Sequence, residues 1–234
     1  MTESVFIKNS SDDCLRTKAA KVALDYVLNN ITPSSVIGIG TGATVEIFVA
    51  LLAGSNAQFA HCVSSSVRSS KALQNMSLKE QPLEMCDGID FYIDGIDEGL
   101  ANGMTIKGGG AALAREKILA SVSNRFITIA DRGRLVDGFG HFPLPIEILP
   151  VSKAAVLKSI QNLGGNSIQR SDCITDNGNL IIDVSGLDMS NPEWLEQRLN
   201  RIPGVVENGI FAHRKADFMA FSDEVGTDWN SVCD

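Results

Sequence analysis

The sequence predicts an α/β fold, a mostly parallel Rossmann-like sheet with an inserted ferredoxin-like α+β domain. Two observations lead to this prediction. Up to about residue 142, apolar runs of strand length alternate with segments of helical period, which is typical of a mostly parallel sheet. From residue 143 the order becomes strand, helix, strand, strand, helix, strand, which is the ferredoxin-like arrangement.

The first part of the chain begins with an amphipathic helix at residues 12–30, whose apolar side is formed by Leu15, Ala19, Val22, Ala23, Tyr26 and Val27. The elements that follow are a strand at 34–42 that runs into a glycine turn, a helix at 43–54, a short strand at 57–63, a strand at 89–93, a helix that opens at Ala111 and a strand at 125–130. The segments IDFYI at 89–93 and RFITIA at 125–130 are mostly apolar, so we expect both faces of these strands to be buried.

The second part contains six elements, at residues 146–149 (strand), 152–165 (helix), 166–172 (strand), 179–185 (strand), 191–204 (helix) and 205–212 (strand). The connection TDNGN carries the Asn-Gly pair of a tight hairpin. A last strand at 216–221 is expected to return to the first sheet. The predicted domains are a catalytic α/β domain, residues 1–142 and 212–234, and a smaller α+β domain, residues 143–211.

Composition and charge limit the classes of function. The net charge of −8 and the isoelectric point near 4.9 argue against a nucleic-acid binder, so an anionic substrate would have to be held by local positive groups. Five cysteines form no C-x-x-C pair, which fits a reducing cytosol better than a disulfide scaffold or a zinc site. No segment resembles a signal peptide or a membrane span, so we expect a soluble cytoplasmic protein with no membrane partner.

The first glycine-rich segment, GIGTGATV, lies between a strand and a helix start and contains Gly38, Gly40, Thr41, Gly42 and Thr44. Backbone N–H groups and the helix dipole favour an anion such as a phosphate at this position. Gly38, Gly40 and Ala43 also satisfy the G-x-G-x-x-G/A pattern of dinucleotide sites. That alternative requires an acidic residue about 20 positions further on, where the segment AQFAHCVSSS has none. Glycines that serve only a tight turn are a third explanation.

Two carboxylates and a lysine surround a second glycine-rich segment. Asp94 ends the apolar run IDFYID, Asp97 follows three residues later, and Lys107 directly precedes the glycines at 108–110. The carboxyl ends of strands in open α/β sheets face the crevice that binds ligands, although an Asp there can also be a turn or cap residue. A solvated loop lysine is the ordinary alternative for Lys107. The three glycines, which let a backbone approach a ligand closely, favour a binding function.

Glu116 is the most informative residue of the chain. Its neighbours at three and four positions along the predicted helix are all apolar: Ala112, Leu113, Leu119 and Ala120. Arg115 and Lys117 flank it in sequence but point away by about 100°. A carboxylate in this position is either paired with a distant cation in a structural ion pair or held with a raised pKa, as a general base near neutral pH needs.

The histidines are less informative. His61, His141 and His213 are scattered and show no metal-ligand spacing such as H-E-x-x-H, so we predict no metal site. The chain also has no G-x-S-x-G segment of the kind that carries a serine nucleophile.

Six blocks of the sequence together resemble the type A ribose-5-phosphate isomerases, in that family's order and from Gly38 to Asp217: GIGTGATV, YIDGIDE, IKGGGAALAREKI, FPLPIEILP, TDNGNLIIDV and IPGVVENGIFAHRKAD. The resemblance implies an aldose–ketose isomerase that interconverts D-ribose 5-phosphate and D-ribulose 5-phosphate through an enediolate, in the non-oxidative branch of the pentose phosphate pathway. It also implies that no metal or organic cofactor is used, and that the protein is a homodimer or a tetramer.

The resemblance implies roles for individual residues as well. Glu116 would be the catalytic base, and Asp94, Asp97 and Lys107 would line the sugar site. The substrate-binding positions that it implies are Thr41, Gly42, Ala43, Thr44, Asp94, Gly95, Ile96, Asp97, Lys107, Gly108, Gly109, Gly110 and Arg134. For an enediolate mechanism we expect Lys107 and the loop N–H groups to stabilise the oxyanion, and Asp94 or Asp97 to assist ring opening.

Three positions depart from the family pattern. Ala43 replaces a common serine and removes one hydroxyl from the phosphate loop, so we expect weaker binding rather than loss of activity. Arg134 replaces a lysine that contacts phosphate, which keeps the cation but changes its geometry. Ile96 replaces a common alanine, and its consequence is not predictable from the sequence.

Two other classes of function stay open at this stage. A sugar-phosphate sensor would bind ribose 5-phosphate without converting it, but the repressors of this kind carry a DNA-binding helix-turn-helix for which the N-terminal segment is too short. An NAD-dependent oxidoreductase would bind a nicotinamide cofactor. The isomerase accounts for more of the sequence than either alternative.

Overall fold

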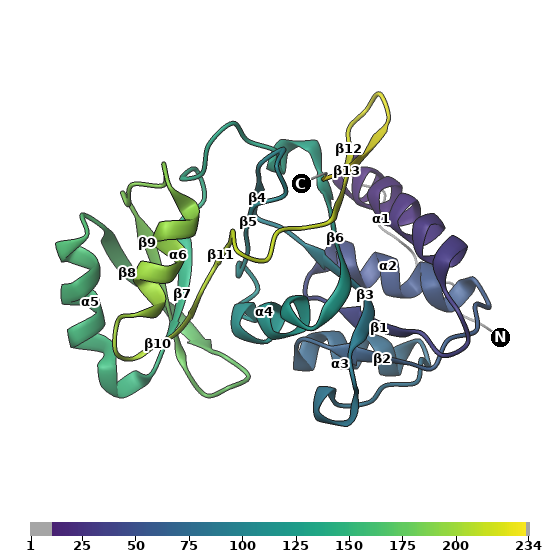
Figure 1. Ribbon diagram of the computed structural model, residues 1–234, viewed down its shortest axis with the longest axis horizontal. Helices are drawn as coiled ribbons and strands as arrows, with labels where there is room; N and C mark the ends of the chain where they lie inside the picture. Colours follow the sequence, from purple (N-terminus) through teal and green to yellow (C-terminus); the bar gives the residue numbers. More distant parts are fainter. Residues whose placement is uncertain (1–10, 233–234) are drawn as a thin grey trace.

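The computed structural model of the chain describes residues 11–232 (Figure 1). Its largest sheet has the strand order β13-β12-β6-β3-β1-β2, in which β13 is antiparallel to β12 and all other neighbours are parallel. The predicted mostly parallel sheet is therefore confirmed. Its strands are β1 (Val36–Ile39), β2 (His61–Ser64), β3 (Ile89–Gly95), β6 (Ser123–Asp131), β12 (Phe218–Ser222) and β13 (Thr227–Ser231).

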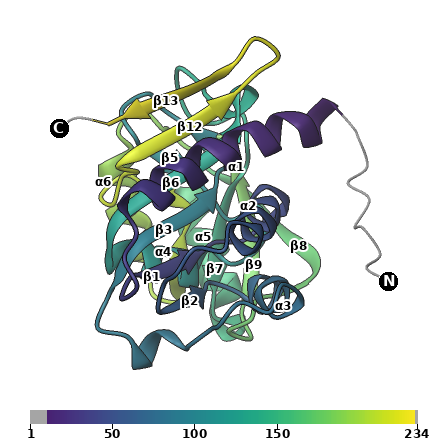
Figure 2. The same ribbon diagram turned by 90° about the vertical axis from the view of Figure 1, so that its right-hand side faces the viewer.

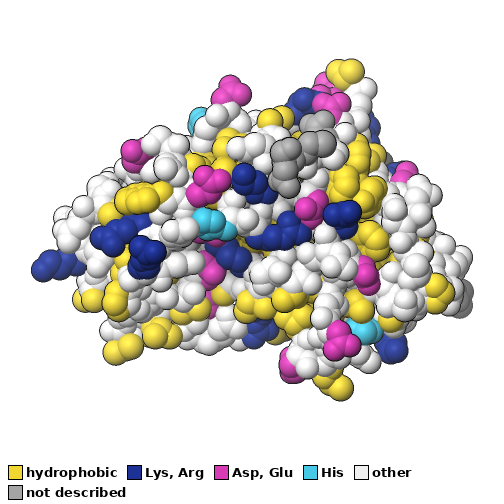
Figure 3. Space-filling view, viewed as in Figure 1, with side chains coloured by type: hydrophobic (Ala, Val, Ile, Leu, Met, Phe, Trp, Pro, Cys, Tyr) yellow, Lys and Arg dark blue, Asp and Glu magenta, His cyan; other side chains and the backbone are white. Residues whose placement is uncertain are grey.

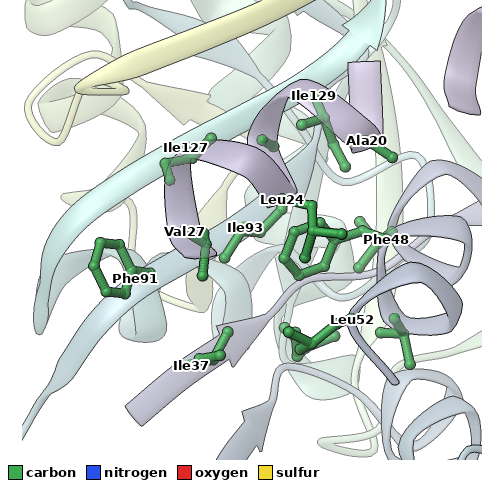
Figure 4. Packing of buried hydrophobic residues seen from close by; sticks show 14 of the residues in the cluster. Ala20, Leu24, Val27, Ile37, Phe48, Leu52, Phe91, Ile93, Ile127 and Ile129 are labelled. Carbon is green, nitrogen blue, oxygen red and sulfur yellow. The ribbon is translucent and has the colours of Figure 1, made fainter. Parts of the chain in front are cut away.

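Helices α1 (Ser11–Asn30) and α2 (Ala43–Gly54) cover one face of this sheet. Figure 2 shows α1 lying along the β12–β13 hairpin, so the first and last elements of the described chain lie side by side. The strands contribute apolar side chains because the runs in β1, β3 and β6 are buried on both faces. The residues that meet in this core include Ala20, Leu24, Val27, Ile37, Phe48, Leu52, Phe91, Ile93, Ile127 and Ile129 (Figure 4).

The opposite face of the sheet is covered mainly by α4 (Leu113–Ser121), where Leu119 packs in a second core with Tyr92 and Phe126. Helix α3 (Val67–Asn75), which follows β2, is not among the elements predicted from the sequence. This helix is short and mostly polar, and only two of its residues, Ser69 and Leu73, are buried. Its start is nevertheless capped, because the Ser66 hydroxyl accepts a hydrogen bond from the backbone N–H of Ser69.

A four-stranded sheet forms the second lobe of the molecule, on the left in Figure 1. Its order is β10-β7-β9-β8 and all neighbours are antiparallel, as expected for a ferredoxin-like unit. Its elements are β7 (Leu144–Ile148), α5 (Lys153–Asn162), β8 (Asn166–Ile174), β9 (Leu180–Ser185), α6 (Pro192–Asn200) and β10 (Val205–Asn208).

A small sheet of β4 (Glu98–Gly99), β5 (Thr105–Ile106) and β11 (Ile210–Phe211) lies between the two lobes. The single strand predicted at 205–212 is therefore wrong, because the chain leaves β10 at Gly209 and pairs with β5 instead. Gly209 donates its N–H to the Pro145 carbonyl and accepts a hydrogen bond from the N–H of Lys107. A Cβ atom at Gly209 would collide with the Lys107 carbonyl, so glycine is required where the sheets meet.

None of the helices between residues 11 and 232 combines the length and the apolar character needed to cross a membrane. On the face shown in Figure 3, acidic and basic side chains are interspersed over both lobes. Capture of an anion therefore depends on cations placed locally rather than on a charged face.

Candidate active site

A cavity of about 250 Å³ opens at the carboxyl ends of β1, β3 and β6. Parallel strands place their following loops at one edge of the sheet, so segments far apart in sequence meet there. The residues assigned from sequence that line the cavity are Thr41, Gly42, Ala43, Thr44, Gly95, Ile96, Asp97, Lys107, Gly108, Gly109, Gly110, Glu116 and Arg134. Asp94 does not line it, because its side chain is completely buried behind Lys107.

The centre of the site is a buried group of one ammonium and two carboxylates. The Nζ atom of Lys107 lies 2.7 Å from Oδ2 of Asp94 and 3.2 Å from Oε2 of Glu116, and each of these side chains is at most 2% exposed. Nζ also donates a hydrogen bond of 2.6 Å to the Gly95 carbonyl. Burial by itself would lower the pKa of Lys107, but attraction to Asp94 and Glu116 outweighs it and raises that pKa.

Asp94 has all of its hydrogen-bonding capacity occupied. Its Oδ1 atom accepts from the N–H groups of Thr41 and Gly95, at 3.1 and 2.7 Å. Its Oδ2 atom accepts from the Tyr92 hydroxyl and faces Lys107. Four donors surround this one carboxylate, so Asp94 acts as the fixed counter-ion of Lys107.

Glu116 lies in the first turn of α4 and reaches the cavity through the apolar surroundings that its sequence neighbours predicted. Burial, followed by repulsion from Asp94, raises its pKa to about 8, against the opposing attraction of Lys107. The two sequence alternatives for this residue, a structural ion pair or a raised pKa, therefore coexist: Glu116 is paired with Lys107 and still holds its proton to near-neutral pH.

The residues beside Glu116 anchor α4 to the smaller sheet. Arg115 donates hydrogen bonds to the side chain of Asn177 and the carbonyl of Asp176, at 2.8 and 2.9 Å. On the other side, Lys117 forms ion pairs with Glu196 (2.8 Å) and Glu207 (2.9 Å). Because these cations face other partners, neither of them neutralises Glu116.

Asp97 differs from Asp94 in that it faces the cavity. Its Oδ2 atom accepts a 2.7 Å hydrogen bond from the N–H of Gly109. Burial raises its pKa, which the Gly109 N–H and the nearby charges of Lys107 and Arg134 partly oppose. Asp97 is therefore a carboxyl group that can exchange a proton with a bound molecule.

Three guanidinium groups line the cavity, from Arg16 on α1, Arg68 on α3 and Arg134 in the turn after β6. Sequence reasoning identified only Arg134. Arg16 looks like an ordinary surface charge of an amphipathic helix, and Arg68 lies on a helix that was not predicted. No local pattern in the sequence distinguishes either residue, since their place at the cavity comes from packing of distant elements.

The loop after β1 has features that suit an anion. The N-cap position of α2, Gly42, provides no side-chain cap, so the first N–H groups of this helix are open to a ligand. The Thr41 hydroxyl lies within hydrogen-bond distance of the hydroxyl groups of Ser65, Ser66 and Ser69, and these contacts hold the loop in place. Ser65 and Ser66, which directly follow β2, therefore support the loop together with Ser69.

Among residues 11–232 no group of three or more histidine, cysteine, aspartate or glutamate side chains is arranged to hold a metal ion. Of the histidines, His61 contacts the Cys86 thiol and His141 lies near Glu98, both away from the cavity lining. The polar groups of the cavity wall include carboxylates, a lysine, three guanidinium groups and backbone N–H donors. The fold and the site together define an α/β enzyme that moves protons on a small anionic substrate.

Comparison with known proteins specifies this class. The profile of the family described as ribose 5-phosphate isomerase A (phosphoriboisomerase A) matches residues 61–226. The ribose 5-phosphate isomerase A of Neisseria gonorrhoeae has 35% sequence identity and a TM-score of 0.90, with coverage of 96% of this chain and 99% of that one. The enzyme of Methanocaldococcus jannaschii has 31% identity and a TM-score of 0.86, with coverage of 94% and 99%.

A third similar structure is a D-ribose-5-phosphate isomerase in complex with phospho-erythronic acid, with 33% identity, a TM-score of 0.88 and coverage of 95% of this chain and 100% of that one. The chain belongs to the ribose 5-phosphate isomerase A family. It is an isomerase of ribose 5-phosphate, an enzyme of the pentose phosphate pathway, and the comparisons favour this function over the sensor and the oxidoreductase.

Proposed function

We propose that Glu116 carries the proton between C2 and C1 of the open-chain sugar phosphate. The observation that carries this proposal is a buried carboxylate in the cavity wall whose pKa is raised to about 8 beside Lys107. A base with a pKa near the working pH combines a sufficient ionised fraction with a strong drive for proton transfer. A single carboxylate can serve both carbons because they are neighbours.

The proposed reaction proceeds through an enediolate. Glu116 removes the proton from C2 of the aldose, and the electron pair moves through the new C1–C2 double bond to the carbonyl oxygen. The resulting enediolate receives the same proton at C1, while the hydroxyl on C2 gives up its proton to the oxygen on C1 and becomes the ketone. Lys107 and the N–H groups of the 108–110 loop face the developing negative charge, where fixed donors are most effective.

We propose that Asp97, rather than Asp94, assists ring opening. Asp94 has no free lone pair directed at the cavity, because Thr41, Gly95, Tyr92 and Lys107 occupy its oxygens. Asp97 lines the cavity and has a raised pKa, so it can exchange a proton with the ring oxygen or the hydroxyl at C1.

The phosphate is proposed to bind between the N-terminus of α2 and the guanidinium groups of Arg16, Arg68 and Arg134. The open N–H groups of the helix and a guanidinium fork are both suited to phosphate oxygens. These donors do not include a side chain at Ala43, so the missing hydroxyl removes one contact among several. Phospho-erythronic acid, which a related isomerase binds, should compete with ribose 5-phosphate for this cavity.

Glu116→Gln tests the central proposal. The amide keeps the size of the side chain but cannot accept a proton, so turnover should fall by at least about 100-fold while the protein stays folded. The matched control is Glu147→Gln, because Glu147 is also fully buried but binds the 175–179 hairpin instead of the cavity. Near-normal turnover in Glu116→Gln would remove Glu116 from the proton transfer.

The resemblance to the family further supports a homodimer, with a tetramer as the alternative, in the cytoplasm. Light scattering of the purified full chain at micromolar concentration measures the oligomeric state directly. A monomer at working concentrations would contradict the first proposal, and localisation of the tagged chain outside the cytoplasm would contradict the second.

A further inference from the structure

Arg170 belongs to the smaller sheet but contacts the glycine loop of the cavity. It lies on β8, an edge strand, and its Nη1 atom donates to the carbonyl oxygens of Gly108 (3.2 Å) and Gly109 (3.1 Å). Its Nε and Nη2 atoms donate to the two carboxylate oxygens of Asp183 on β9, at 2.8 and 2.5 Å. One guanidinium therefore connects the second lobe to the loop, although Arg170 itself does not line the cavity.

The glycine loop needs a restraint of this kind. Gly108 has a φ of +108° and Ala111 a φ of +59°, in the left-handed region, and consecutive glycines gain more freedom than other residues when a contact is lost. The loop contributes one internal backbone bond, from the N–H of Ala111 to the Gly108 carbonyl. A side chain at Gly109 could not replace the restraint, because a Cβ atom there would lie 2.6 Å from Oδ1 of Asp97.

Peptide planarity transmits the contact from Arg170 to the cavity. In a trans peptide the carbonyl group and the following N–H point in opposite directions. With the Gly108 carbonyl held by Arg170, the N–H of Gly109 is turned to the other side, where it donates to Oδ2 of Asp97 at 2.7 Å. Arg170 holds the Gly109 carbonyl in the same way, so the N–H of Gly110 is turned away from Arg170. Gly110 itself lines the cavity.

We propose that Arg170, oriented by Asp183, is a positioning residue for catalysis: it holds two loop carbonyls so that Asp97 and the loop N–H donors face the substrate. This inference rests on the proposed function, because it concerns the same cavity. It assigns a catalytic contribution to the smaller lobe, which otherwise contributes no residue to the cavity wall.

Arg170→Lys is the primary test. Lysine keeps the positive charge but has no planar fork, so it cannot hold Asp183 and both carbonyls together. We expect kcat for ribose 5-phosphate to fall by about 10- to 100-fold, the effect of misplacing catalytic groups by around an ångström, with a smaller change in KM. Circular dichroism and thermal unfolding should report a folded protein.

Arg214→Lys is the matched control. Its guanidinium is similarly exposed, 27% against 21% for Arg170, and also bonds an aspartate and backbone carbonyls, but it touches neither the loop nor the cavity. The control should keep kcat within about twofold, since its site is independent of the loop. Equal losses of kcat in both variants, or a loss that matches the decrease in folded protein, would overturn the proposal.

Asp183→Asn provides the second variant in case Arg170→Lys does not fold. It should lower kcat in the same direction, and the double variant should lose no more than the worse single variant, because both residues act as one unit. Additive losses would mean that Asp183 acts independently and would overturn the pairing. Glu116→Gln is measured in the same assay: if it loses turnover while Arg170→Lys does not, the proposed function stands and only this inference fails.

Discussion

The Nζ atom of Lys107 lies 2.7 Å from Oδ2 of Asp94, and the two side chains are 2% and 0% exposed. Glu116 shares the same ammonium at 3.2 Å, so this buried group holds two carboxylates and one cation. When all three are ionised the group carries a net charge of −1. Burial, together with repulsion from Asp94, raises the pKa of Glu116, so we expect Lys107 to be needed for folding as well as for chemistry.

Lys107→Met should destabilise the protein strongly. Methionine fills a similar volume but leaves Asp94 and Glu116 buried together without a cation, which typically costs about 3–5 kcal/mol of the free energy of unfolding. Urea unfolding followed by circular dichroism measures this loss. Lys71→Met is the control, because Lys71 is exposed and a surface change should stay within about 0.5 kcal/mol. If Lys107→Met and Lys71→Met lost a similarly small free energy of unfolding, the ion pairs of Lys107 with Asp94 and Glu116 would not be important for stability.

The pH dependence of kcat/KM should follow the ionisation of Glu116. Only the carboxylate can accept the C2 proton, and its pKa is raised to about 8 by burial and by repulsion from Asp94. Activity should therefore rise as pH increases through about 8 and fall up to tenfold for each pH unit below it. Ionisation of the substrate's phosphate group cannot produce a change of kcat/KM at that pH, because its second pKa is about 6. A profile that is level between pH 6.5 and 8.5 would contradict the assignment.

Gly40→Ala should inactivate the enzyme by displacing Asp94. A Cβ atom at Gly40 would collide with Cγ and Oδ1 of Asp94, which four donors hold in place. We expect a loss of stability of about 1–3 kcal/mol from overpacking, and a larger loss of kcat than of substrate affinity. Gly138→Ala is the control, since a Cβ atom at that position meets no atom within 4 Å. Full activity in Gly40→Ala would show that the position of Asp94 is unimportant.

Asp97→Asn and Asp94→Asn should have different effects on the two directions of the reaction. Ribose 5-phosphate is mainly a closed ring, whereas ribulose 5-phosphate is open because its C5 hydroxyl is esterified. Asp97→Asn should slow the conversion of ribose 5-phosphate more than the conversion of ribulose 5-phosphate. In the second reaction the open-chain aldehyde can leave the enzyme and close its ring in solution. Asp94→Asn should slow both directions equally, since Asp94 contacts Lys107 and does not line the cavity. Initial rates in each direction distinguish the two outcomes.

Much of the fold could be predicted from local sequence. The helix at 43–54 and the parallel strands of the main sheet follow from runs whose apolar period reports burial directly. Helix α3, the small sheet and β13 were missed because each is short or weakly apolar. The domain boundaries at 142/143 and 211/212 stay a prediction.

The sequence by itself determined the glycine loops, the lysine before 108–110 and the apolar surroundings of Glu116, because backbone freedom and helical neighbours are properties of adjacent residues. Only the tertiary structure decided that Asp94 is buried as a counter-ion, that Arg16 and Arg68 reach the cavity, and that Arg170 holds the loop from the other lobe. These contacts join residues on separate elements, and the packing of strands and helices brings them together without leaving a local pattern in the chain.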